Sequence, residues 1–107
     1  MRQFRRANDR TMIQQGMFRF RLYVAGDARN STQALVNLTG LCRAHLPDRH
    51  SIEVVDVLRQ PKRALTDGIF MTPTLVKLAP LPARRIVGTL KDTEVVLQAL
   101  GLAEIVA

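Results

Sequence analysis

The sequence predicts a single α/β domain whose elements follow in the order β-α-β-α-β-β-α. Three observations predict this class. A chain of 107 residues is normally one domain, and 47% hydrophobic residues can fill a modest core. Apolar residues alternate in some segments, as in strands, and recur every three or four residues in others, as in helices. Proline and glycine bracket several of these segments.

The first strand and the first helix follow directly from these periods. In FRFRLYV, apolar side chains at the even positions of residues 18–24 alternate with Arg, Arg and Tyr, which predicts a strand with one buried face. AGDARNS is a loop, and Asn30 or Ser31 is expected to cap the next helix. Pro47 stops that helix. Its apolar stripe comprises Ala34, Leu35, Leu38, Leu41, Cys42, His45 and Leu46.

The remaining elements are shorter. SIEVVDVL is apolar on both faces, which predicts a strand inside the sheet. Pro61 and Gly68 bracket the short helix KRALTD. TLVKL and RRIVG are further strands, joined by a proline-containing turn. Asp92 is expected to cap a last helix that ends before Gly101. The apolar face of this helix is predicted to comprise Val95, Val96, Ala99 and Leu100.

This order is the thioredoxin-like arrangement βαβαββα, with a right-handed crossover through the first helix. In such folds a cis-proline commonly precedes the third strand, and Thr72-Pro73 stands at that place. Pro80 and Pro82 fall in the turn before the fourth strand, where no ladder donor is lost. The prolines are therefore compatible with the sheet.

The fold raises a redox hypothesis that the residues disfavour. Thiol chemistry needs a cysteine at the start of the first helix, and residues 25–31 contain none. Cys42 lies about three turns further along and is expected to be a core residue. Glutathione transfer through Ser31 or Tyr23 would require a second, all-helical domain. We therefore predict a protein that is not an enzyme.

Cysteine and histidine content also limits cofactors and compartment. One cysteine, with His45 and His50, does not complete a zinc set, so we predict no metal and no cofactor. A single cysteine fits a reducing cytoplasm. No apolar run approaches a membrane span, so a membrane partner is not expected.

The formal net charge is +7, which favours an acidic partner. Four arginines against one aspartate place +3 of that charge in residues 1–16, which we interpret as a disordered basic arm before a domain of residues 17–107. A transit peptide is an alternative for this arm, although it lacks serine. Nucleic-acid binding is disfavoured because Phe4 is the arm's one aromatic residue.

Four blocks together carry a family resemblance: LYVAGDARNS, EVVDVLRQP, TPTLVKLAPLP and RRIVGTLKD. In this order and spacing they resemble the KaiB family of clock proteins over residues 17 to about 102. The resemblance implies a non-enzymatic timing regulator that binds the hexameric ATPase KaiC, with a histidine kinase as a possible competitor for the same site. The alternative is a thioredoxin-like adaptor or sensor module of another bacterial signalling or stress-response system.

The resemblance also implies fold switching. Family members exchange a thioredoxin-like monomer with a ground state, a homo-dimer or homo-tetramer, whose C-terminal half is rearranged. LAEIVA alternates like a strand, whereas VVLQALGLAE has the spacing of a helix, so the end of the chain is compatible with either structure. Residues 61–107 are the segment expected to change structure. Ala99 stands where many members have glycine, which favours helix by about 0.5–1 kcal/mol and thus the thioredoxin-like state. The fold-switch residues are expected to be Pro73, Pro80, Pro82, Gly88 and Ala99.

For partner binding the resemblance points to the short helix with its approach and to the start of the fourth strand. The alternative for these charged residues is a solvated helix face and strand end. Asp56 is expected to cap the turn after its strand, and Gly26 and Gly88 to supply positive φ. The expected partner-binding residues are Arg59, Lys62, Arg63, Leu65, Thr66, Asp67, Arg84 and Arg85.

Overall fold

The computed structural model describes residues 17–102 and confirms the expected order of elements. The elements are β1 (Phe18–Val24), α2 (Arg29–His45), β2 (His50–Asp56), α3 (Pro61–Thr66), β3 (Thr74–Ala79), β4 (Arg84–Val87) and α4 (Thr93–Ala99). The expected basic arm and the expected strand-like end of the chain lie outside the described residues, apart from Leu102.

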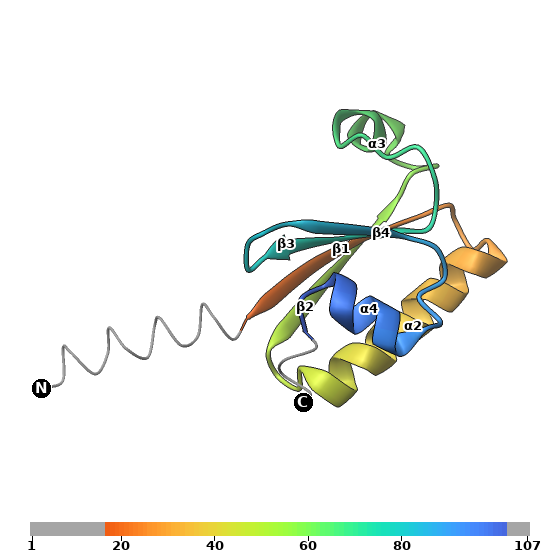
Figure 1. The fold of residues 1–107 in the computed structure, drawn as a ribbon. Helices are drawn as coiled ribbons and strands as arrows, with labels where there is room; N and C mark the ends of the chain where they lie inside the picture. The colour runs from red at the N-terminus through yellow and green to blue at the C-terminus, as the bar shows by residue number, and fades with distance from the viewer. Residues whose placement is uncertain (1–16, 103–107) are drawn as a thin grey trace, which may run out of the picture.

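The four strands form one mixed sheet in the order β2-β1-β3-β4. β1 pairs in parallel with β2 and antiparallel with β3, and β3 pairs antiparallel with β4. α2 and α4 lie on one face of this sheet, whereas α3 stands on the other face (Figure 1). This is the thioredoxin-like arrangement that the order of elements predicts.

The main core lies between the sheet and the pair α2 and α4. The even-numbered residues of β1 point into it, as the alternation predicts. Leu22, Leu38 and Leu75 are completely buried there, and each such side chain contributes about 1.5–3 kcal/mol of hydrophobic stabilisation. Cys42 is also fully buried in this core, as expected.

A second, smaller cluster holds α3 against the opposite face of the sheet. It consists of Tyr23, Val55, Ala64 and Ile69. Tyr23 belongs to the polar side of β1 in the sequence pattern, yet it is only 1% exposed because α3 covers it. β1 is therefore buried along the whole of one face, whereas its other face is buried only near its C-terminal end, at Tyr23.

The prediction that the strand after α2 lies inside the sheet is wrong. β2 pairs only with β1 within residues 17–102 and forms an edge. Val54 is 44% exposed on the α2 side, whereas Val55 is buried beneath α3. The apolar residues on both faces of β2 thus reflect partial cover from a helix on each side, not strands on each side.

The predicted helix caps are confirmed for α4 but not for α2. Asp92 caps α4 by accepting the Val95 N–H at 3.3 Å, as expected. α2 begins at Arg29 without a side-chain cap, and the Ser31 hydroxyl instead accepts the Ala25 N–H at 3.1 Å. On α4, Val95 is 57% exposed and Leu97 is buried instead, so the expected apolar face was placed wrongly by part of a turn.

The loops carry the prolines and glycines at the expected places. The Thr72-Pro73 bond is cis, and so are the bonds preceding Pro80 and Pro82 in the β3–β4 turn. Gly26 and Gly88 have φ of +58° and +124°, which confirms the expected positive φ. Across residues 17–102, every helix is too short or too polar to traverse a lipid bilayer.

Candidate docking surface

The short helix α3 presents most of the residues expected to bind a partner. It begins at Pro61, whose missing N–H costs nothing at a first helical position, and ends before Gly68, whose φ is +71°. Ala64 is the buried residue of this helix. Lys62, Leu65 and Thr66 face solvent, and Leu65 is 71% exposed.

A chain of polar contacts fixes α3 to the sheet. The Tyr23 hydroxyl donates to Asp67 Oδ2 at 2.5 Å, and Arg21 Nη1 lies 3.7 Å from the same oxygen. Glu53 bridges two guanidinium groups at 2.8 Å, with Oε1 on Arg21 and Oε2 on Arg63. β1, β2 and α3 are therefore tied together by alternating positive and negative groups, which holds the helix in one orientation.

The pKa shifts of the groups in these polar contacts favour a structural role for Tyr23 and Glu53. Burial, followed by the bond to Asp67, raises the pKa of the Tyr23 phenol above its ordinary value. Hydrogen bonds from Arg21 and Arg63 lower the pKa of Glu53. At neutral pH Tyr23 is thus protonated and Glu53 is ionised, and the contacts that hold α3 persist.

The structure brings Arg85 to α3 but separates Arg84 from it. Arg85 donates to the carbonyl oxygens of Gly68 at 2.9 Å and Asp67 at 3.0 Å, at the end of the helix. Arg84 pairs with Lys77 in the sheet and faces the side of α2 and α4. Consecutive residues of a strand point to opposite faces, so the two arginines do not form one patch.

Arg59 and Asp56 lie at the approach to α3. Asp56 Oδ1 accepts the N–H groups of Gly26 at 3.0 Å and Leu58 at 2.9 Å, which confirms its expected role as a turn cap. These bonds lower the pKa of its carboxyl group. Arg59 Nε lies 3.8 Å from Oδ2 with the arginine side chain 87% exposed, a pair of little energetic weight.

Sequence reasoning missed several exposed apolar residues beside α3. Phe70 is 86% exposed, Leu58 is 70% exposed and Met71 is 62% exposed. The available signal was an apolar FM pair in a loop, directly before Thr72-Pro73, where no strand or helix period explains it. A groove of about 130 Å³ runs along this loop, lined by Gly68, Ile69, Phe70, Met71, Thr74, Arg85 and Val87.

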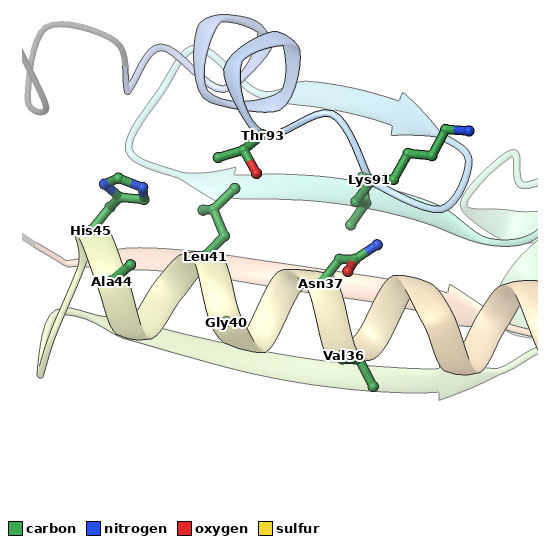
Figure 2. A pocket seen from close by; sticks show the side chains of 9 residues that line it. Val36, Asn37, Gly40, Leu41, Ala44, His45, Lys91 and Thr93 are labelled. Atoms are coloured by element: carbon green, nitrogen blue, oxygen red, sulfur yellow. The ribbon is translucent and has the colours of Figure 1, made fainter.

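A second hollow, of about 350 Å³, lies between α2 and the start of α4 (Figure 2). Gly40 leaves it open, because a Cβ at that position would meet nothing within 4 Å. Asn37 crosses its edge by donating to the Thr89 carbonyl at 2.7 Å. In Figure 2 the Lys91 side chain extends away from Thr93 and α2, so these polar groups do not converge on one point.

The loop before α2 and the first turn of this helix, residues 25–31, contain no cysteine. Ser31 stands there, buried and bonded to the Ala25 N–H. Burial raises the pKa of the Cys42 thiol to about 11, which makes it a poor nucleophile. Among residues 17–102 no three His, Cys, Asp or Glu side chains lie close enough to hold a metal.

The expected fold-switch residues lie around β3, β4 and the end of α4. Pro73 is buried at the entrance of β3, and its carbonyl accepts the Gly88 N–H at 3.0 Å. Ala99 is the last residue of α4. Next to it, the Leu100 carbonyl accepts a hydrogen bond at 3.0 Å from Lys77, a lysine that is only 4% exposed.

Solved structures with a similar fold include a thioredoxin and the N-terminal domain of SasA. Deadhead, a thioredoxin of Drosophila melanogaster, is 13% identical with a TM-score of 0.63, covering 87% of this chain and 89% of that one. The N-terminal domain of SasA of Synechococcus elongatus is 23% identical with a TM-score of 0.62, covering 80% and 82%. These likenesses show a thioredoxin-like fold.

Sequence comparison is more specific. The model of the KaiB domain matches residues 21–102. Circadian clock protein KaiB3 of Synechocystis sp. is 43% identical over 82 residues, 77% of this chain and 80% of that protein. Circadian clock oscillator protein KaiB of Synechococcus elongatus is 45% identical over 82 residues, again 77% and 80%. The chain belongs to the KaiB family.

Proposed function

We propose that this chain is a non-enzymatic, cytoplasmic timing regulator that docks on a KaiC-like ATPase hexamer. Docking occurs through the α3 surface, which we define as Arg59, Lys62, Arg63, Leu65, Thr66, Asp67 and Arg85. The observation that carries this proposal is the fixed position of α3. Its exposed residues lie on a helix whose C-terminal end is fixed by two contacts. The Tyr23 hydroxyl donates to the Asp67 carboxylate, and Arg85 donates to the Gly68 carbonyl.

A surface of this kind is suited to protein binding. Leu65 is 71% exposed beside the exposed Lys62, and an apolar residue surrounded by charge is typical of an interface. Binding normally costs free energy for ordering the contact residues. Here the polar contacts of Asp67, Arg63 and Arg85 already order the backbone of α3, so that cost is reduced.

Two further observations support the proposal. Relatives that share more than two fifths of their aligned residues with this chain are named circadian clock oscillator proteins. Redox catalysis is disfavoured because residues 25–31 contain no cysteine and Cys42 is buried with a raised pKa. We also propose that a histidine kinase with a KaiB-like sensor domain competes for the same site on the ATPase.

A binding measurement tests this proposal. The full chain is titrated against an ATP-loaded KaiC hexamer, with the variants Lys62→Glu and Leu65→Ser. Both side chains are exposed, so neither change should unfold the protein, and each should weaken binding by at least about tenfold. Arg43→Glu is the matched charge reversal, since Arg43 is exposed on α2, on the other face of the sheet. Equal effects of Arg43→Glu and Lys62→Glu, or no binding by the unaltered chain, would refute the proposal.

We also propose that residues 61–107 exchange between this fold and a ground state that is a homo-dimer or homo-tetramer. Pro73, Pro80, Pro82, Gly88 and Ala99 are the residues on which the exchange depends. Support comes from the short α4, only seven residues long, which is too short to be stable without tertiary contacts. At its C-terminal cap, the Leu100 carbonyl accepts a hydrogen bond from the buried Lys77.

Size-exclusion chromatography with NMR secondary shifts tests the exchange. We expect a monomer with helical shifts at Thr93–Ala99 in the binding state. Ala99→Gly should move the population towards the oligomer, but by less than the about 0.5–1 kcal/mol that glycine costs in a helix interior, because Ala99 is the last residue of α4. A chain that stays monomeric and helical there under every condition, with or without Ala99→Gly, would rule out the exchange.

A further inference from the structure

Among the described residues, 17–102, none pairs with the outer side of β4. Within residues 17–102 it pairs only with β3. The Gly88 N–H donates to the Pro73 carbonyl, so this opposed pair is a hydrogen-bonded one. Bonded and non-bonded pairs alternate in an antiparallel ladder, which makes the pairs of Ile86 and Arg84 the next bonded ones. The N–H and C=O groups of Arg85 and Val87 therefore point away from β3.

The side chains of these same two residues line the groove beside the α3–β3 loop. Val87 is 51% exposed on one wall, and Phe70 and Met71 are 86% and 62% exposed on the other. Three large apolar side chains thus border a hollow of about 130 Å³ that adjoins an unpaired strand edge. A strand that paired with β4 would place every second side chain over this groove.

Arg85 also brings a positive charge to the groove, and in the described part of the chain no carboxylate pairs with it. Arg85 donates two N–H groups to backbone carbonyls, which are neutral, and a guanidinium has five N–H donors. None of the ion pairs among residues 17–102 includes Arg85. A carboxylate that approaches from the open side of β4 can therefore gain a charge-assisted contact without displacing the bonds that hold α3.

We propose that β4 accepts an extended peptide segment of a partner protein as an additional antiparallel strand. The segment carries an apolar residue opposite Val87, which enters the groove, and an acidic residue two positions later, which meets Arg85. The spacing follows because directly opposed residues in a sheet share a face. This inference deepens the proposed docking, with which it shares Arg85, by naming the chemistry of the partner segment.

The probe is a capped, threonine-rich nonapeptide with one isoleucine and, two residues later, one glutamate. It is titrated into the isotope-labelled full chain and followed by NMR. We expect saturable amide shifts centred on Arg85 and Val87, together with slower hydrogen exchange of these two amides. Replacing the glutamate of the probe by lysine should weaken binding by about tenfold. Methylating the probe's backbone nitrogens that face β4 should abolish binding.

Two variants of the protein keep the test decisive. Val87→Pro removes the outward N–H without removing a bond to β3, and Val87→Lys keeps the backbone but places a charge in the groove. Both should lose the probe, whereas Val54→Lys on the edge of β2 should bind it unchanged. Shifts centred on β2 or on the exposed side of α3, or equal binding of the methylated probe, would overturn strand addition.

The same variants separate this inference from the proposed function. Probe binding without any binding of a KaiC hexamer would leave strand addition standing and remove the proposed partner. If Val87→Lys loses the probe but binds KaiC as tightly as the unaltered chain, strand addition is not part of that docking, and the claim that it deepens the docking is overturned.

Discussion

Replacement of Tyr23 by phenylalanine tests whether the polar contacts between α3 and the sheet stabilise the α3 surface. The change removes the 2.5 Å hydrogen bond to Asp67 and a longer one, of 3.4 Å, that the hydroxyl accepts from Arg21 Nη1, and it leaves the buried ring in place. A hydrogen bond to a charged group contributes about 1.5–3 kcal/mol. The Asp67 side chain is 28% exposed and keeps Arg21 at 3.7 Å and Arg63 at 4.0 Å, so water and the guanidinium groups replace part of the loss. We therefore expect the lower end, about 1.5 kcal/mol.

Urea and thermal unfolding followed by far-UV circular dichroism measure this loss. For a domain of this size 1.5 kcal/mol corresponds to a decrease in Tm of about 6–12 °C. Asp67→Asn and the double variant complete a cycle in which the two losses should not add. A change below about 0.5 kcal/mol for Tyr23→Phe, or full additivity in the cycle, would refute the reasoning.

The chain has one tyrosine and no tryptophan, so tyrosinate absorbance reports Tyr23 alone. Burial and Asp67 raise its pKa in the folded protein, so the midpoint should lie above the ordinary value of about 10. Because the pKa is raised in the folded state, the stabilisation that the protonated Tyr23 contributes is fully present below about pH 10 and is lost as the pH rises through the folded-state pKa. Asp67→Asn removes a negative charge beside the phenol and should lower the midpoint. A midpoint at the ordinary value would contradict the buried position.

Four further predictions concern other parts of the fold. Gly40→Ala should stabilise the protein by about 0.5–1 kcal/mol in urea unfolding, because the new Cβ meets nothing within 4 Å and glycine is costly inside a helix. Gly26→Ala is its counterpart and should destabilise, since φ there is +58° and a Cβ would lie 3.4 Å from Leu58. Cys42 should not react with a disulfide reagent at pH 8 until denaturant is added, because its pKa is about 11, and reaction in the native state would place it nearer the surface. Backbone N–H groups lower the pKa of Asp56, so its stabilisation is present above the ordinary value of about 3.9 and is lost as the pH falls through the folded-state pKa. Asp56→Asn should therefore flatten the dependence of the urea midpoint on pH below about 4, and an unchanged pH profile would exclude this role.

Local patterns in the sequence determined the elements of this protein. The alternation in β1, the proline and glycine around α3 and the Asp92 cap each act through contacts within a few residues, so they are visible without the fold. The absence of cysteine from residues 25–31 likewise disfavoured redox chemistry from composition alone.

Tertiary structure alone decided which of these elements meet. An edge strand can be apolar on two faces just as an interior strand can. The sequence of β2 therefore fits either position, and only the order of strands in the sheet shows that β2 is an edge strand. Tyr23 looks solvent-facing in its strand and is buried because α3, some forty residues later, folds over it. Arg85 meets the end of α3 through the pairing of β3 with β4, whereas Arg84, its neighbour, points to the other face. The physical reason is that a sequence period records whether a side chain is covered, while the identity of what covers it depends on pairing between distant segments.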